Sequence, residues 1–374
     1  MKIAINCLSA KIGGGITYLQ NIVPLLIKHD NKNKYFLVVS SVVGREILGA
    51  IGPTAPKPVL ITINTDNILF RLFAEQILLP LVVLKNKIDL LYCPANIVPF
   101  LAPCRKLLWI QNIDPFIEIK GESMLVKLKM KILRAMTIFS MKHSDAVVFS
   151  SDYSKALVLA ALAFTVKNVR TIPLGVISRN FRPEPRSVRE DYILSVSNIS
   201  NRKNYDLLIR AYSKLKPEIS RKYRLLIAGR IGKNKLKDYI DEMNRNGLND
   251  RIIFMGELHG EELYSAYKKA SMFVFPSLVE SFGLPLLEAM AAGLPVLAAN
   301  STAIPEVVGN AGELFDPTRA DDLANRITAL IENIPERMKL ALRAQQRAEL
   351  FSWENTAKAV LSLFDEILGK MGPK

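Results

Sequence analysis

The densest group of residues able to do chemistry is a short segment between two glutamates. Glu280 and Glu288 mark its ends, and Ser281, Gly283 and Pro285 lie between them. Gly and Pro at these positions predict a loop that passes into the first turn of a helix. The N–H groups at such a helix start favour an anion such as a diphosphate, so the two carboxylates are suited to accept hydrogen bonds from sugar or ribose hydroxyls instead. The alternative is that Glu280 is a helix cap and Glu288 a solvated helix residue.

A second candidate is a run of three glycines, Gly13, Gly14 and Gly15, after an apolar segment at 2–6. Glycines here allow a ligand to approach the backbone at a helix that begins near Ile16. The run is not a G-x-G-x-x-G, and no acidic residue stands where a ribose would need one, so a dinucleotide site is poorly supported. A plain glycine turn is the alternative.

These candidates must be positioned by short apolar strands that alternate with amphipathic helices. Strands are expected at 2–6, 35–40, 90–93, 107–111, 146–150, 192–196, 224–228, 252–255, 272–276 and 295–299. Alternation of this kind predicts an α/β protein with parallel sheets covered by helices on both faces. Ligands bind such sheets at the carboxyl ends of the strands.

The series of strands starts twice, which predicts two doubly wound Rossmann-like domains facing each other across a cleft that holds the site. Residues 178–191 contain two Pro and many charges and resemble a linker. We expect an N-terminal domain at 1–180, a C-terminal domain at 181–352, and a final helix at 353–374 that packs back on the first domain.

Composition excludes several classes of protein. The 374 residues are 49% hydrophobic and 23% charged, which is ample for two cores and excludes a disordered chain. Three Cys without a C-x-x-C and three scattered His argue against a disulfide scaffold or a metal site. No apolar run approaches the ~20 residues of a spanning helix. We therefore expect a cytoplasmic protein with reduced thiols and no metal.

The positive charge is concentrated in the first half of the chain. The net charge is +15, and residues 1–180 hold 22 basic and 10 acidic side chains, against 28 and 25 in 181–374. Within 120–142, helical spacing gathers five cations in one arc: Lys120, Lys127, Lys131, Arg134 and Lys142. Leu125, Leu128, Ile132 and Phe139 line a neighbouring arc, and residues 82–87 extend the same basic character. This pattern is typical of a helix that rests its apolar face on the core or on a bilayer, with the cations beside it. Docking to an anionic membrane surface is the functional interpretation, and a solvated helix face is the alternative.

The segment around the two glutamates resembles a known family. Residues 276–317 read PSLVESFGLPLLEAMAAGLPVLAANSTAIPEVVGNAGELFDP, similar to the donor-binding segment of retaining glycosyltransferases of the GT-B fold, family 4. The resemblance extends through ILSVSNISNRKNYDLLIRAY, LLIAGR, RIIFMGELHGEELYSAYKKA and FSWENTAKAVLSLF, and so covers 192–374. The first half matches more weakly, through the glycine run and WIQNIDPF. Within the family the chain most resembles mannosyltransferase-like enzymes of bacterial surface polysaccharides.

The resemblance implies a role for each matching residue. Glu280 would contact the donor sugar at the catalytic centre, and Lys203 would stabilise the departing nucleoside diphosphate. The remaining donor-binding residues would be Asn198, Arg202, Ser281, Phe282, Gly283, Leu284, Glu288, Gly14 and Gly15. Gln111 and Asn112 would face the acceptor. The partners would be a nucleoside-diphosphate sugar and a glycan or lipid-linked acceptor, without metal or other cofactor.

Two departures from the family pattern are present. Ser197-Asn198 stands where the family usually has Gly-Arg, so one cation for the diphosphate is missing or supplied elsewhere, with Arg202 a candidate. Gln111-Asn112 stands where many members have His-Asp, and neither side chain acts as a general base at neutral pH. Asp114 is the nearest carboxylate. This agrees with a retaining reaction in which the leaving phosphate oxygen takes the acceptor proton.

Two other functions remain as alternatives. A GT-B epimerase would act on the nucleotide sugar alone, without an acceptor. A nucleic-acid binder would explain the positive charge, but no RNP-type, helix-turn-helix or zinc-finger motif is present.

Overall fold

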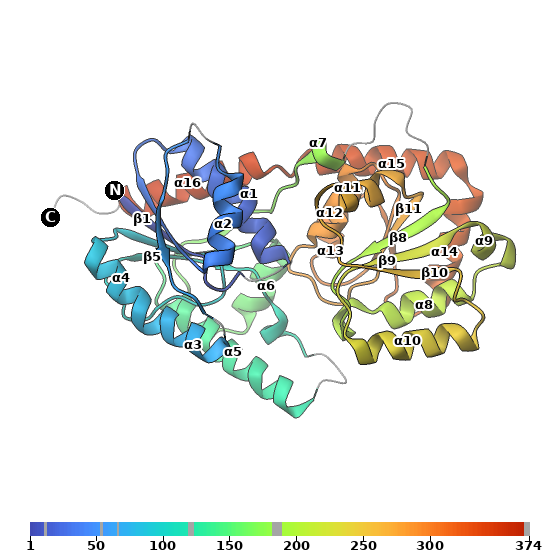
Figure 1. Ribbon diagram of the computed structural model, residues 1–374, viewed down its shortest axis with the longest axis horizontal. Helices are drawn as coiled ribbons and strands as arrows, with labels where there is room; N and C mark the ends of the chain where they lie inside the picture. Colours follow the sequence, from blue (N-terminus) through green and yellow to red (C-terminus); the bar gives the residue numbers. More distant parts are fainter. Residues whose placement is uncertain (11–12, 53–54, 66, 119–122, 182–188, 370–374) are drawn as a thin grey trace. The chain divides into compact units, whose positions relative to one another are not determined.

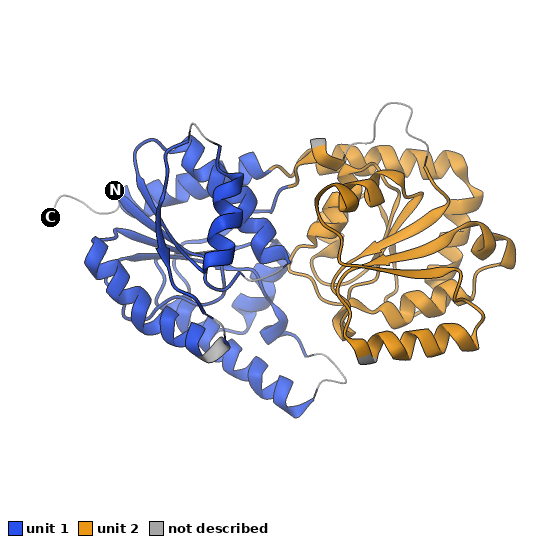
Figure 2. Cartoon of the chain, in the orientation of Figure 1, with its two compact units in different colours: residues 1–175, 353–374 blue, residues 176–352 orange. Residues whose placement is uncertain are grey.

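Two parallel β-sheets, one in each of two units, organise the chain (Figures 1 and 2). The computed structural model describes residues 1–10, 13–52, 55–65, 67–118, 123–181 and 189–369. Unit 1 comprises residues 1–175 and 353–374, and unit 2 comprises residues 176–352. The predicted fold class, with two Rossmann-like α/β domains, is confirmed.

Unit 1 contains a seven-stranded sheet in the order β3-β2-β1-β4-β5-β6-β7. The strands are β3 (Val59–Thr62), β2 (Lys34–Val39), β1 (Lys2–Asn6), β4 (Leu90–Cys93), β5 (Arg105–Ile110), β6 (Ala146–Phe149) and β7 (Val169–Thr171). β1 pairs with both β2 and β4, so the order of the chain reverses between β1 and β4. Ligands of doubly wound sheets bind beside such a reversal, at the carboxyl ends of the strands.

Helices connect the strands of unit 1. They are α1 (Gly14–His29), α2 (Ser41–Ala50), α3 (Ile68–Phe73), a π-helical turn η1 (Ala74–Leu78), α4 (Leu79–Asn86), a 3-10 turn η2 (Asp114–Phe116), α5 (Met124–Lys142), α6 (Asp152–Ala160) and α16 (Trp353–Gly369). α3, η1 and α4 follow one another without a break, as Figure 1 shows.

The last helix, α16, completes the core of unit 1. Trp353 packs edge-on against Tyr18 of α1 at 5.7 Å between ring centroids, and Phe364 packs against Tyr92 of β4 at 5.5 Å. Thr356 Oγ1 donates to the carbonyl of Pro173 at 2.8 Å. All four aromatic side chains are nearly or fully buried, so α16 belongs to this core although it is the most distant segment in sequence.

Unit 2 repeats the plan with a six-stranded parallel sheet in the order β10-β9-β8-β11-β12-β13. Its strands are β8 (Tyr192–Val196), β9 (Arg224–Ala228), β10 (Ile252–Gly256), β11 (Met272–Phe275), β12 (Val296–Ala299) and β13 (Glu313–Phe315). Its helices are α7 (Ser178–Phe181), η3 (Asn201–Lys203), α8 (Tyr205–Ser213), α9 (Pro217–Lys222), α10 (Lys233–Arg245), α11 (Gly260–Lys269), α12 (Leu284–Ala291), α13 (Ile304–Val308), α14 (Ala320–Glu332) and α15 (Ile334–Ala348). Here the chain order reverses between β8 and β11.

Two predictions about elements need correction. The sequence did not indicate β3, β7 and β13, because each is a strand of three or four residues at a sheet edge, too short for a clear pattern. The prediction of a linker at 178–191 is wrong for residues 178–181 and 189–191, the two ends that the structure describes. Phe181 is buried against Tyr264 and Tyr267, and Arg189 donates to four carbonyls at the ends of α11 and α12. Residues 182–188 of that segment lie outside the described residues.

Among the residues that the structure describes, no helix is both long enough and apolar enough to span a bilayer.

Candidate active site

The predicted catalytic residues lie at the reversal point of the unit 2 sheet. η3, which carries Arg202 and Lys203, follows β8, and the loop with Glu280 follows β11. β8 and β11 pair directly in parallel, so their carboxyl ends are neighbours. Sequence positions nearly 80 residues apart are thereby brought to one edge of the sheet.

Hydrogen bonds of backbone groups and of two hydroxyl side chains fix the loops after β8, β11 and β12 to one another. Leu278 N donates to the carbonyl of Arg202 at 2.7 Å, which links the first two loops. Glu280 N donates to Thr302 Oγ1 at 3.0 Å, and Ser301 Oγ donates to the carbonyl of Leu278 at 2.6 Å, which link the third. The loop that carries Glu280 is therefore held by groups from two other loops, as a precisely placed side chain requires.

Lys203 and Glu280 form an ion pair between Lys203 Nζ and Glu280 Oε1. The side chains are only 13% and 12% exposed, so the pair is shielded from solvent far more than the surface pairs of this chain. The ammonium also lies 5.8 Å from the centroid of the Phe275 ring, at the end of β11. This arrangement holds a cation and a carboxylate side by side. An anionic ligand that also carries sugar hydroxyls could contact Lys203 through its anion and Glu280 through its hydroxyls.

The helix α12 begins directly beside this pair. Gly283, its N-cap, has φ 100°, a left-handed conformation that favours glycine. A Cβ there would stand 3.4 Å from the Phe275 ring and 3.9 Å from Glu280 Cγ. No side chain of the described residues caps α12, so its N-terminal amides are oriented for an anion.

The other predicted residues of this segment divide into two kinds. Phe282 is buried and packs against Phe351 at 5.7 Å, which makes it a packing residue. Ser281 and Leu284 are half-buried beside Gly283, and the prediction concerns their backbone amides.

Glu288 lies one turn inside α12 and is tied to α11. Tyr267 Oη donates to Glu288 Oε2 at 2.9 Å and also lies 3.2 Å from the carbonyl of Pro285. Burial raises the pKa of Glu288 to about 7, against the lowering effect of the Tyr267 hydrogen bond. A carboxyl group of this kind changes protonation near neutral pH, and a ligand hydroxyl that donates to it would favour its ionised form.

Asn198 lies at the same sheet edge, after β8. Its Oδ1 accepts from Arg230 N at 3.2 Å, and Arg230 forms an exposed ion pair with Glu257 at 2.8 Å. Gly229, just before Arg230, has φ 142°, and a Cβ there would stand 1.9 Å from the carbonyl oxygen of Ser197. The close approach of β9 to the Ser197–Asn198 backbone therefore requires glycine.

Four predicted residues lie in unit 1. Gly14 and Gly15 begin α1, after the positive-φ N-cap Gly13. Gln111 and Asn112 follow β5, where Asn96 Oδ1 accepts from both of their backbone amides, at 3.2 and 3.0 Å. These residues are thus at the carboxyl side of their sheet, and their ligand contacts remain predictions.

Sequence reasoning missed Thr302 and Tyr267, which hold site residues of unit 2, and Asn96, which holds Gln111 and Asn112 in unit 1. Thr302 has φ 51°, which no pattern of residue types predicts for a threonine. Tyr267 and Asn96 act through contacts with segments 15 or more residues away, so neighbouring residues gave no signal for them. Within the described part of the chain, no three His, Cys, Asp or Glu side chains are grouped to hold a metal ion.

Comparison with known families gives a match for unit 2. The family model for glycosyl transferases group 1 matches residues 176–347, nearly all of unit 2. Unit 2 is therefore similar to glycosyl transferases group 1, which agrees with the resemblance expected from the sequence.

Individual relatives share about 30% or less of their residues with this chain over the aligned segments. The chain is 29% identical over 238 residues to the serotype-specific mannosyltransferase WbdA of Escherichia coli, which covers 63% of this chain and 29% of the relative. It is 30% identical over 240 residues to the O-antigen chain mannosyltransferase B of Escherichia coli, covering 60% of this chain and 61% of the relative. The chain thus spans about three tenths of the first relative and three fifths of the second.

Solved structures support the fold over both units. Anabaena HepE in complex with UDP-glucose has a TM-score of 0.79 at 17% identity, and the similarity covers 98% of this chain and all of that one. A sucrose-phosphate synthase from Thermosynechococcus elongatus has a TM-score of 0.77 at 19% identity, covering 99% of this chain and 100% of that one. The shared architecture is the GT-B fold.

Proposed function

We propose that this chain is a retaining glycosyltransferase. It would transfer a hexose, for which we propose mannose, from a nucleoside-diphosphate sugar to a hydroxyl of a glycan or lipid-linked acceptor in surface polysaccharide synthesis. The observation that carries the proposal is the shielded Lys203–Glu280 pair beside the uncapped start of α12. The two relatives compared above are mannosyltransferases, which supports the choice of sugar.

In the proposed reaction the bond between the anomeric carbon and the diphosphate oxygen breaks. A new bond from the anomeric carbon to the acceptor oxygen forms on the same face of the sugar. The acceptor proton passes to the leaving phosphate oxygen, so no protein base is needed. Lys203 would meet the charge that grows on the diphosphate, where a fixed cation contributes most.

Each remaining group has a proposed task. Glu280 would hold the hydroxyls of the donor sugar, and Glu288 would accept from the ribose. Arg202 and the amides of residues 281–284 would add positive potential around the diphosphate. With these groups in place, we propose that transfer needs no metal ion.

The test is a transfer assay with the purified chain, a guanosine-diphosphate and a uridine-diphosphate sugar, and a lipid-linked glycan acceptor. Glu280→Gln keeps the size of the side chain and removes its charge, so transfer should fall at least about a hundredfold, as expected for an electrostatic group at the reacting centre. Glu332→Gln is the control, because Glu332 is an exposed partner of Lys216 on the same unit. Glu280→Gln activity within a factor of about ten of wild type would refute the assignment.

Three readouts separate the finer parts of the proposal. NMR of the anomeric proton in the product reports retention or inversion. Activity that survives EDTA supports metal independence, and loss that Mg²⁺ restores contradicts it. Release of an epimerised sugar without acceptor would identify an epimerase instead.

A further inference from the structure

Unit 1 carries an apolar face that the fold leaves uncovered. Half of the exposed large apolar side chains of the described residues gather on the continuous helix α3–η1–α4, on α5, and on one loop position between them. Scattered exposed apolar residues are ordinary, whereas contiguous ones mark an interaction surface. We define the apolar face as Phe70, Phe73, Ile77, Leu81, Leu84, Leu101, Met124, Leu125, Leu128, Ile132 and Phe139, which are 41–80% exposed.

The first part of the apolar face follows one side of the α3–η1–α4 helix. Its residues, from Phe70 to Leu84, are spaced by three or four positions, which is the helical repeat. The opposite side of this helix is buried through Ala74, Glu75, Leu79 and Val83. The helix thus presents large apolar side chains to solvent, while its packed side is apolar except for the buried Glu75.

The second part lies on α5, where sequence reasoning left two interpretations open. Thr137, Ser140 and Met141 form the buried side of α5. Leu125, Leu128 and Ile132 instead are 79%, 54% and 52% exposed. The apolar arc predicted from the sequence therefore faces outward and does not rest on the core.

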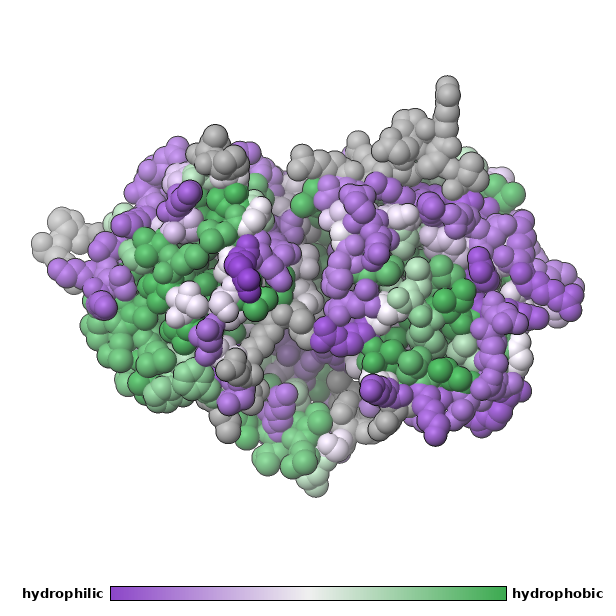
Figure 3. All heavy atoms as spheres, viewed as in Figure 1, coloured by the Kyte–Doolittle hydropathy of each residue, from purple (hydrophilic) through white to green (hydrophobic). Residues whose placement is uncertain are grey.

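The residue range 98–101 joins the two parts into one surface. Gln76 of η1 exchanges hydrogen bonds with the backbone of this loop, at 3.2 Å from Val98 O and 3.2 Å from Phe100 N. On its other side, Phe100 packs edge-on against Phe139 of α5 at 4.4 Å. Leu101, 78% exposed, projects from this junction. Figure 3 shows apolar side chains over α3 and α4 and again around the N-terminal end of α5.

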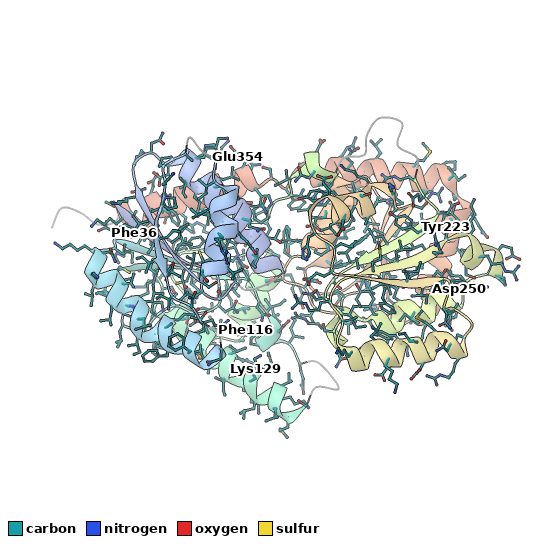
Figure 4. The ribbon with its side chains drawn as sticks, in the orientation of Figure 1. Phe36, Phe116, Lys129, Tyr223, Asp250 and Glu354 are labelled. Carbon is teal, nitrogen blue, oxygen red and sulfur yellow. The ribbon has the colours of Figure 1, made fainter. Side chains whose placement is uncertain are left out.

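The exposed charged side chains of α3–η1–α4 and α5 are all positive. α5 contains no Asp or Glu, and its cations are all exposed: Lys127, Lys129, Lys131, Arg134 and Lys142. Lys85 and Lys87 are exposed at the end of α4, and the only acid of α3–η1–α4, Glu75, is buried. Figure 4 marks Lys129 on α5 and Phe116 on η2, over whose ring Arg134 lies at 5.5 Å. Lys120 of the predicted basic stripe lies outside the described residues.

We propose that this apolar face inserts into the interfacial region of an anionic phospholipid bilayer, with its cations contacting the headgroups. An apolar stripe on helices whose exposed charges are all Lys or Arg fits this partner, since anionic headgroups surround an apolar interior. The inference goes beyond the proposed function and does not depend on it, because membrane binding is measured without a nucleotide sugar.

The first experiment is flotation of the full chain with vesicles. Binding is expected to vesicles that contain phosphatidylglycerol, and weak binding to pure phosphatidylcholine. At about 0.5 M salt a substantial fraction should stay bound, because screening removes the electrostatic part only. Complete release at that salt concentration would show that attachment is by charge alone and overturn insertion.

The second experiment compares two triple variants at positions of similar exposure. Replacing Leu125, Leu128 and Ile132 by Gln should lower the vesicle partition coefficient about tenfold or more. The matched control replaces Ile334, Met338 and Leu342 by Gln. These residues are 55%, 67% and 56% exposed on α15 of unit 2, so loss of binding should be confined to the first variant. Equal loss in both variants, or in neither, would refute the proposal.

A spectroscopic variant reports insertion directly. Leu128→Trp adds a fluorophore to a chain whose two native Trp, Trp109 and Trp353, are buried. Its emission should shift to shorter wavelength when phosphatidylglycerol vesicles are added. Binding without a shift, or a dimer in solution whose formation already shifts the emission without vesicles, would contradict insertion and, in the second case, assign the face to a second copy.

Discussion

Glu288→Gln should change how the stability of unit 2 depends on pH. Glu288 is an acid whose pKa is raised by burial from its ordinary 4.5 to about 7, while it accepts a hydrogen bond from Tyr267. Glutamine cannot ionise, has nearly the same size, and keeps an oxygen that accepts the Tyr267 hydrogen bond. The substitution therefore removes the titration and leaves the packing.

The direction and size of this pH effect follow from the difference between the pKa of Glu288 in the folded and in the unfolded chain. Between pH 4.5 and about 7 the folded protein holds a proton on Glu288 that the unfolded chain releases, so wild-type stability falls as pH rises through this range. The gap between the two pKa values corresponds to about 3 kcal/mol, at about 1.36 kcal/mol per pKa unit. Below pH 4.5 the contribution of protonated Glu288 to the free energy of unfolding is fully present, and above about pH 7 it is lost.

The assay is urea unfolding of wild type and Glu288→Gln from pH 4.5 to pH 8, with Glu332→Gln as a control at an exposed site. The variant should gain stability relative to wild type as pH rises, by about 3 kcal/mol at most, and the gain should level off above about pH 7. A difference between variant and wild type that stays constant with pH would refute the assigned pKa, whatever its sign.

Three further changes test other parts of the structure. Gly229→Ala should destabilise unit 2 by more than about 2 kcal/mol in urea unfolding, because its Cβ would meet the Ser197 carbonyl at 1.9 Å, whereas Gly232→Ala, with open space around it, should be nearly neutral. Lys203→Ala should raise the activation free energy of transfer by about 2–4 kcal/mol, measured as a lower kcat with little change in KM. A rise in KM alone would contradict transition-state stabilisation. Trp353→Ala should destabilise unit 1 by about 3–5 kcal/mol through loss of the packing of α16, and an unchanged thermal midpoint would show that α16 does not support this core.

The sequence predicted the two sheets because their central strands are continuous apolar runs between helices. β1, β4, β8 and β9 have the predicted bounds, since buried parallel strands carry a strong local signal. The edge strands β3, β7 and β13 were missed, because pairing on one side only lets short and partly polar segments serve as strands.

The candidate site was predictable where it depends on sequence order. Glu280, Gly283 and Glu288 follow one strand, and Lys203 follows another, so the carboxyl-end rule for parallel sheets placed them correctly at strand ends. The contact between Lys203 and Glu280 was not predictable, because it depends on the direct pairing of β8 with β11 and on hydrogen bonds that Thr302 Oγ1 and the Arg202 carbonyl accept from the Glu280 loop.

Which helix faces are covered depends on the tertiary packing and could not be predicted from the sequence. The sequence determined that 120–142 has an apolar arc beside a basic one, but an arc that packs on a core and an arc that meets solvent have the same helical spacing. Burial is a property of the neighbouring elements, and here they cover Thr137, Ser140 and Met141 and leave Leu125 and Leu128 exposed. For the same reason the pKa of Glu288 could not be predicted from the sequence, since it is set by the α11 and α12 surfaces that bury the carboxyl group.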